Sequence, residues 1–232
     1  MKTKTLTLLL SALLFGCSSQ PSTDADNRFQ NMSGGQSVGD ATSFYWYSEE
    51  LEYPYSAADY VDSGKHGWYF SDYRWRDGVV REIVRQGEQL EEKNGLVPFK
   101  IHLRFNQSGE AVYQQYRLDG KVLPMQPQQI TMVQNSAESI KNTVKKQHAK
   151  GQRLIQGYWD GKGFRTCSGE TYQNVEFNQI LPDFVVNRLA NLDSYAAFLG
   201  TTSPSKLVVQ DLYMLEEDSV DCVNRPLLIT EE

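Results

Sequence analysis

The sequence of 232 residues has few histidines and few cysteines, and neither occurs at the spacings that metal sites use. Its three histidines, His66, His102 and His148, lie far apart and lack a pattern such as His-Glu-x-x-His. No Cys-x-x-Cys pair occurs, and Gly161-Lys-Gly163 lacks the third glycine of a dinucleotide site. We therefore expect no metal site and no cofactor.

Basic charge and long apolar runs are also scarce. The formal net charge is -6, which argues against a nucleic-acid partner because phosphate binding needs a basic surface. The longest apolar stretch, residues 6–15, would span roughly 15 Å as a helix, half of the ~30 Å hydrocarbon core. With Lys2 and Lys4 before it, this stretch is typical of a signal peptide over residues 1–16, not of a membrane-spanning anchor.

The end of that segment, Leu14-Phe15-Gly16-Cys17, resembles the lipobox of bacterial lipoproteins. The resemblance implies that Cys17 carries a thioether-linked diacylglycerol and an N-acyl chain, which attach the protein to a membrane. Ser18 stands where the family's inner-membrane retention signal would be Asp, so the resemblance implies the periplasmic face of the outer membrane. The alternative is an ordinary secretory signal with a chance cysteine.

Acylation of Cys17 would leave Cys167 and Cys222 as an even pair in an oxidising compartment. A disulfide between them is therefore expected. The alternative, a metal site, is weak because no histidine lies near either residue.

The composition predicts an α+β fold in three parts after the signal peptide. Residues 17–43 are rich in Ser, Gly, Gln, Asn and Asp and are expected to form a flexible tether. Residues 44–151 predict an aromatic-rich antiparallel β-meander, formed mainly by residues 66–123, and one long amphipathic helix. Residues 152–232 predict a smaller β-rich lobe stapled by the disulfide.

Local patterns support these parts. In residues 100–105 apolar and polar side chains alternate, as in a strand with one buried face. Asp-Gly steps at residues 77, 119 and 160 are typical of hairpin turns. An apolar stripe with steps of three and four predicts the helix, which Pro127 and Gly151 bound: Ile130, Val133, Ala137, Ile140 and Val144. Residues 182–192 predict a short helix with Phe184, Val185, Leu189 and Leu192 on one face.

Twelve of the 27 aromatic residues lie between Phe44 and Trp75. Aromatic side chains suit half-buried strands, so core packing is one interpretation. The other is an aromatic groove for a lipid, glycan or peptide, whose candidate residues are Tyr45, Trp46, Trp68, Tyr69 and Trp75.

Catalytic patterns are incomplete. Ser37 in Gly-x-Ser-x-Gly lies in a polar segment instead of a strand-to-helix elbow, and Ser203-Pro-Ser-Lys206 has no Lys-Thr-Gly partner. Acid pairs that could in principle cleave glycans are equally explained by surface solvation: Glu49 and Glu50, Asp59 and Asp62, and Glu216 to Asp218. The sequence therefore predicts no catalytic residue.

Several runs resemble the YjaH-like family of uncharacterised lipoproteins of enterobacteria and vibrios: residues 108–112, residues 153–159 and Thr166-Cys-Ser-Gly169. The resemblance implies lipidation and location and transfers no activity. We therefore expect a non-enzymatic outer-membrane lipoprotein that binds an envelope protein or a ligand. The alternative is an envelope hydrolase acting on glycan or ester bonds.

Overall fold

A computed structural model describes residues 28–230 of the chain. The first part is an eight-stranded antiparallel meander in which every strand pairs with its neighbours in sequence. In order, the strands are β1 (Phe29–Val38), β2 (Ala41–Glu50), β3 (Tyr53–Asp62), β4 (Gly67–Arg76), β5 (Val79–Glu91), β6 (Gly95–Phe105), β7 (Ala111–Leu118) and β8 (Lys121–Leu123). The expected Asp-Gly turns at residues 77 and 119 are confirmed, since Asp77, Gly78, Asp119 and Gly120 all have positive φ.

The meander begins earlier than the sequence indicates. β1 and the start of β2 occupy residues 29–38 and 41–43, so the prediction of a flexible tether is wrong for this stretch. The polar composition predicted a flexible segment, but Gly34 and Gly35 are sites of close packing. A Cβ on Gly35 would lie 2.5 Å from the Ser43 carbonyl oxygen and 2.7 Å from the Tyr213 ring. The signal peptide and Cys17 lie outside the described residues.

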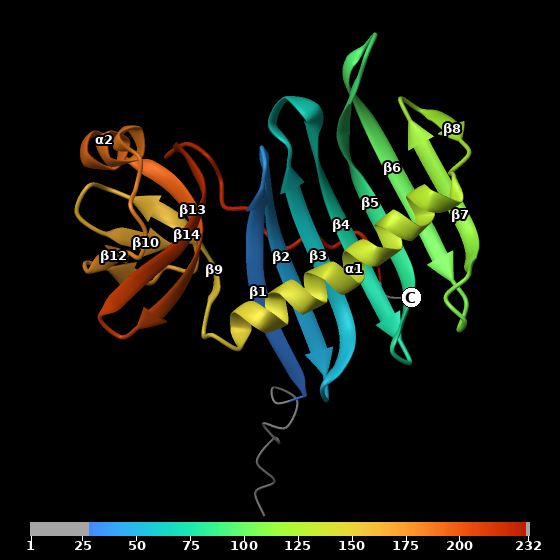
Figure 1. The fold of residues 1–232 in the computed structure, drawn as a ribbon, viewed down its shortest axis with the longest axis horizontal. Helices are drawn as coiled ribbons and strands as arrows, with labels where there is room; N and C mark the ends of the chain where they lie inside the picture. Colours follow the sequence, from blue (N-terminus) through green and yellow to red (C-terminus); the bar gives the residue numbers. More distant parts are fainter. Residues whose placement is uncertain (1–27, 231–232) are drawn as a thin grey trace, which may run out of the picture.

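The predicted long helix is confirmed as α1 (Pro127–His148), which crosses one face of the meander diagonally (Figure 1). A capping box between Gln126 and Gln129 begins it. Four of the five predicted stripe residues are buried against the sheet: Val133, Ala137, Ile140 and Val144. Gln147, near the end of the helix, exchanges two hydrogen bonds with the backbone of Gly35 and so fastens α1 to β1.

A polar row lies beneath α1 in the centre of the sheet. Asp59, Ser71 and Arg85 are in register on β3, β4 and β5. Arg85 donates to Ser71 Oγ and to the Tyr73 hydroxyl, and Tyr73 donates to Asp59 Oδ2 at 3.1 Å. Burial raises the pKa of Asp59, and the nearby Arg85 lowers it in part. Helix α1 covers the row, and Arg85 Nη2 also donates a hydrogen bond to Ser136 Oγ on this helix.

The second part is a six-stranded sheet in the order β11-β10-β9-β13-β14-β12. Its strands are β9 (Arg153–Trp159), β10 (Phe164–Thr166), β11 (Thr171–Tyr172), β12 (Val175–Phe177), β13 (Ser194–Ser203) and β14 (Lys206–Glu217). All pairings are antiparallel except that of β12 with β14. We call this part the C-terminal lobe (residues 153–217). Together the two sheets and the helices confirm the predicted α+β class.

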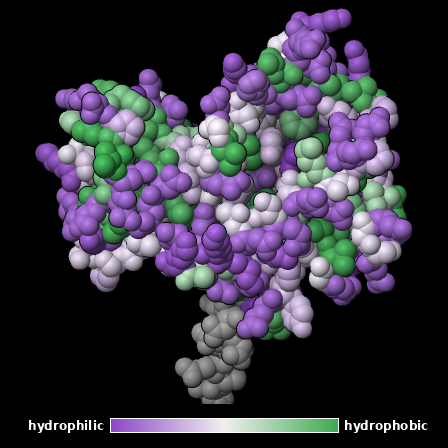
Figure 2. All heavy atoms as spheres, viewed as in Figure 1, coloured by the Kyte–Doolittle hydropathy of each residue, from purple (hydrophilic) through white to green (hydrophobic). Residues whose placement is uncertain are grey.

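The predicted short helix is confirmed as α2 (Asp183–Asn191). Its buried residues are Val185 and Leu189, whereas Phe184 and Leu192 are 73% and 56% exposed. Of the four residues predicted to share one face of the helix, only Val185 and Leu189 are therefore buried. In Figure 2 hydrophobic residues gather on the surface over α2, in line with the exposure of Phe184.

The expected disulfide between Cys167 and Cys222 is confirmed. After β14 the chain forms a segment without helix or strand, which contains Cys222 and which we call the strap (residues 218–230). Gln156 on β9 holds its first half by accepting from the Val223 N–H and donating to the Val223 carbonyl. The strap then passes behind the meander, on the face opposite α1 (Figure 1).

Candidate ligand groove in the C-terminal lobe

Three aspartates lie at one end of the second sheet, because three neighbouring strands end or begin there in register. Trp159 of β9 pairs with Ser194 of β13, and Ser194 pairs with Glu217 of β14. The next residue beyond each of these positions is acidic: Asp160, Asp193 and Asp218, respectively. The register therefore gathers three carboxylates that are distant in the sequence.

A groove of about 510 Å³ opens beside these carboxylates. That volume lies within the range of roughly 300 to 1,000 Å³ that small-molecule pockets occupy. Its lining combines two aromatic rings, four charged side chains and smaller polar groups: Tyr158, Trp159, Asp160, Gly163, Arg165, Thr171, Gln173, Asp193 and Asp218. Both polar and apolar ligand surfaces can therefore be contacted there.

Strands β9, β10 and β11 form the other wall of the groove. Arg165 on β10 is in register with Tyr158 on β9 and with Thr171 on β11. The Arg165 guanidinium lies 5.9 Å from the centroid of the Tyr158 ring, within the range of a cation–π contact. Gly163 allows a close approach, since a Cβ there would lie 3.0 Å from the Tyr172 carbonyl oxygen.

The charge of the groove is acidic. Asp160 Oδ1 accepts hydrogen bonds from the Lys162 and Gly163 N–H groups at 2.9 and 2.8 Å. These bonds lower the pKa of Asp160, so its carboxylate stays ionised at neutral pH. The nine lining residues include three aspartates and one arginine. Ligand groups that donate hydrogen bonds or carry positive charge therefore suit this lining best.

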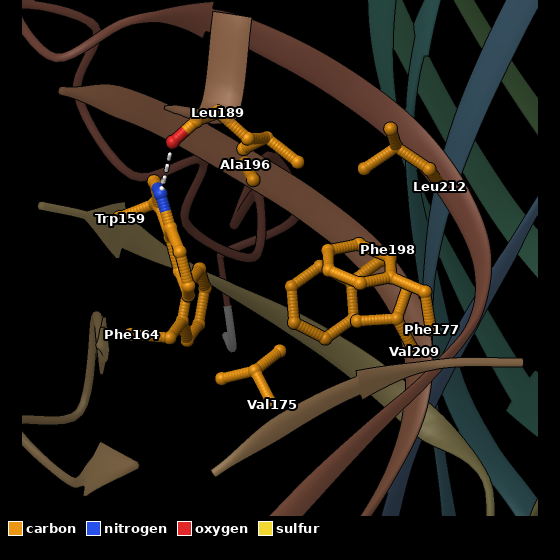
Figure 3. A pocket seen from close by; sticks show the side chains of 9 residues that line it. All are labelled: Trp159, Phe164, Val175, Phe177, Leu189, Ala196, Phe198, Val209 and Leu212. Carbon is orange, nitrogen blue, oxygen red and sulfur yellow. Dashed lines mark hydrogen bonds between the residues drawn. The ribbon is translucent and has the colours of Figure 1, made fainter. Parts of the chain in front are cut away.

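Trp159, which lines the groove, has a fixed orientation. Its indole Nε1 donates to the Leu189 carbonyl of α2 at 2.7 Å (Figure 3). One side of its ring also lines a small apolar cavity, together with Phe164, Phe198 and other core residues. This cavity has about 10 Å³ of free volume, no more than one water molecule needs, so it serves packing and not ligand binding. The Trp159 ring is therefore held in place by the core of the C-terminal lobe.

The five aromatic residues proposed from the sequence are not brought together. Tyr45, Tyr69 and Trp75 belong to or pack against the core under α1, and Tyr45 and Trp75 are each 6% exposed. Trp46 packs in a different core cluster, against the second sheet. Trp68 is on the surface and donates through Nε1 to Glu88. The described part of the chain thus forms no single groove from them.

The acid pairs and serine patterns of the sequence have structural roles or lie apart. Glu49 is buried beside the Tyr47 hydroxyl and Lys145 Nζ, at 3.0 and 2.6 Å. Asp59 belongs to the polar row under α1. Ser37 lies at the exposed end of β1, and Ser203 lies at the hairpin between β13 and β14. Of the acids singled out in the sequence, only Asp218 lines the groove.

Sequence reasoning missed Trp159, Asp193 and Arg165 as groove residues. The sequence indicates Asp160 only as part of an Asp-Gly turn. A signal was present, since an aspartate directly flanks each of three strand ends. It becomes informative only when the strand order β9-β13-β14 is known.

Residues 28–230 contain no group of three or more His, Cys, Asp or Glu side chains arranged to bind a metal ion. Neither α1 nor α2, the α-helices of that range, is long and apolar enough to cross a membrane.

A family model described as "Protein of unknown function (DUF1481)" matches residues 33–227 of the chain. The match runs from β1 into the strap and so includes every residue that lines the groove. No curated protein and no solved structure matches the chain.

Proposed function

The chain belongs to the DUF1481 family of proteins of unknown function, and from that premise we propose a lipid-anchored envelope protein that binds a small polar ligand. The proposed anchor is Cys17, on the periplasmic face of the outer membrane. The proposed binding site is the groove between Trp159 and Arg165. The groove, whose lining residues include two aromatic residues and three aspartates, is the observation that carries the binding proposal.

The chemistry of the lining favours a saccharide-like ligand. Sugar rings present an apolar C–H face that stacks on aromatic rings, and Tyr158, whose ring lies beside Arg165, supplies such a ring. Sugar hydroxyls donate hydrogen bonds, which the carboxylates of Asp193 and Asp218 can accept. Gln173 and Arg165 add donors for hydroxyl or amide oxygens. A mixed set of this kind recognises orientation as well as shape.

Isothermal titration of the protein with oligomers of N-acetylglucosamine and of glucose tests the binding proposal, with spermidine as the cationic alternative. We expect saturable binding of one oligosaccharide series. Asp193→Asn with Asp218→Asn should weaken it at least tenfold, because two charged acceptors are removed. Asp221→Asn is the matched control, since Asp221 is exposed outside the groove and should leave affinity unchanged. Binding of spermidine alone, or of nothing, would contradict the saccharide proposal.

The anchor has a separate test that does not depend on the ligand. Cys17→Ser should leave the protein unprocessed or in the fraction released without detergent. The support for this proposal is the lipobox-like sequence before Cys17. Persistence of a mature, membrane-bound Cys17→Ser protein would overturn lipidation and leave the groove proposal standing.

A further inference from the structure

The strap lies on a polar track across strands β2, β3 and β4 of the meander. Arg225 donates to Ser48 Oγ and Ser56 Oγ at 2.8 and 2.7 Å. Farther along, the N–H groups of two successive strap residues, Leu228 and Ile229, both donate to Asp72 Oδ2 at 3.0 Å. These contacts recognise backbone and guanidinium, which are features of an extended peptide and not of an apolar core.

The side chains that receive the strap are deeply buried. Ser48, Ser56 and Asp72 are 3%, 2% and 0% exposed. Each of these side chains projects from the sheet face opposite α1. The hydrogen bonds of the strap place the strap over this face. A sheet face that only packs against a core is usually apolar, because buried polar groups are costly. This track instead carries hydrogen-bond acceptors on Ser48, Ser56 and Asp72.

The strap leaves part of the hydrogen-bonding capacity of the track unused. Asp72 Oδ1 accepts no hydrogen bond within residues 28–230, and Arg74 Nη1 lies 3.5 Å from it. In the same range Arg225 Nε donates to no acceptor although it is buried. Leu227, midway between the two contact points, is 74% exposed. An occupant with one more donor near Asp72 Oδ1 would therefore gain a hydrogen bond that the strap does not supply.

The strap is also tethered at one end only, within the described chain. The disulfide at Cys222 and the Gln156 bonds at Val223 fix its start to the C-terminal lobe. Beyond Val223 the strap makes the hydrogen bonds of Arg225, Leu228 and Ile229 described above, and Pro226 between them is buried. Residues 224–230 pair with no strand of either sheet, so their departure from the track breaks no strand pairing.

We propose that the track formed by Ser48, Ser56 and Asp72 is a binding site for an extended, arginine-containing peptide of another protein. The strap occupies this site in cis as an autoinhibitory segment. It acts at the high effective concentration of a tethered ligand, so a partner peptide binds only when it outcompetes the strap. This site is separate from the groove, and either proposal can fail alone.

A labelled peptide with the strap's own sequence, Asn-Arg-Pro-Leu-Leu-Ile-Thr (residues 224–230), is the probe. It is titrated by fluorescence anisotropy into the full chain and into the full-chain variant Arg225→Ala. We expect at least tenfold tighter binding to Arg225→Ala, because its strap has lost both serine contacts and competes poorly. Leu227→Ala is the matched control and should behave as the unmodified chain, since Leu227 is exposed.

A peptide in which arginine is replaced by alanine should not bind any of these proteins. Equal or absent binding of the original peptide to Arg225→Ala and to the unmodified chain would overturn the proposal.

Hydrogen exchange of the unmodified chain gives a second readout, which does not depend on the folding of a variant. Millimolar peptide should accelerate exchange of the Leu228 and Ile229 amides, because displacement of the strap frees them from Asp72. Amides of β3 should be unaffected. If Leu228 and Ile229 exchange as slowly as the β3 amides, with or without peptide, the strap is a fixed structural segment and the proposal fails.

Discussion

Removal of the disulfide should destabilise the protein by an amount that the closed loop determines. Cys167 and Cys222 are 55 positions apart in sequence. For a loop of that size, the chain-entropy model gives about 4 kcal/mol of stabilisation through restriction of the unfolded chain. Typical domains have a free energy of unfolding of about 5 to 15 kcal/mol. The double variant Cys167→Ser with Cys222→Ser should therefore lose a large fraction of its stability.

The loss should arise mainly in the unfolded state, because other bonds hold the same segment in the folded state. Gln156 makes two hydrogen bonds with Val223, each 2.9 Å long. The Tyr158 hydroxyl donates to the Val220 carbonyl at 3.1 Å. These contacts keep the start of the strap in place when the sulfur–sulfur bond is absent.

Equilibrium unfolding in urea, followed by circular dichroism, measures the effect. We expect the free energy of unfolding to fall by about 4 kcal/mol, as an upper value. The m-value should rise, because an unfolded chain without the crosslink exposes more surface. A loss below about 1 kcal/mol with an unchanged m-value would refute the reasoning, since it would mean that the crosslink does not restrict the unfolded chain.

Three further predictions concern the meander and its core. Burial raises the pKa of Tyr69 to about 12 from 10.0, so its contribution to stability is complete below pH 10 and is lost between pH 10 and 12. In urea unfolding at those two pH values we expect this group to contribute a loss of about 3 kcal/mol; a flat profile would contradict the assigned burial. Gly35→Ala should cost about 1 to 3 kcal/mol by thermal unfolding, because its Cβ would meet Ser43 and Tyr213. Ser37→Ala, at an exposed site on the same strand, should cost less than about 0.5 kcal/mol, and equal effects would argue against close packing at Gly35. Ile140→Ala, 2% exposed under α1, should cost about 2 to 5 kcal/mol in urea unfolding, whereas a near-zero change would contradict the packing of α1 on the meander.

Elements with a regular apolar period were predictable from the sequence. The stripe of α1 and the alternation in β6 identified both elements, since helix and strand bury residues at different periods. The disulfide was predictable because Cys17 was assigned to lipidation and only one pair remained. Turn chemistry predicted the hairpins at Asp77 and Asp119.

β1 was missed because its stabilising contacts come from residues far away in sequence. Gly35 is bound by Gln147 of α1, 112 positions later, and by the Tyr213 hydroxyl of β14, 178 positions later. Local composition cannot distinguish a glycine that permits such an approach from one in a linker. The groove was missed for a similar reason, because Asp160, Asp193 and Asp218 converge only through the strand order of the second sheet.

The most direct test of the central claim, that the C-terminal lobe binds a saccharide-like ligand, is an NMR titration that observes the Trp159 indole N–H. Trp159 lines the groove and its indole N–H is held by the Leu189 carbonyl, so its resonance reports on a ligand bound beside it. Adding an oligosaccharide should shift the Trp159 signal in a saturable way and leave the Trp75 signal, buried under α1, unchanged. A Trp159 signal that does not move at saturating concentrations of either oligosaccharide series would contradict the account.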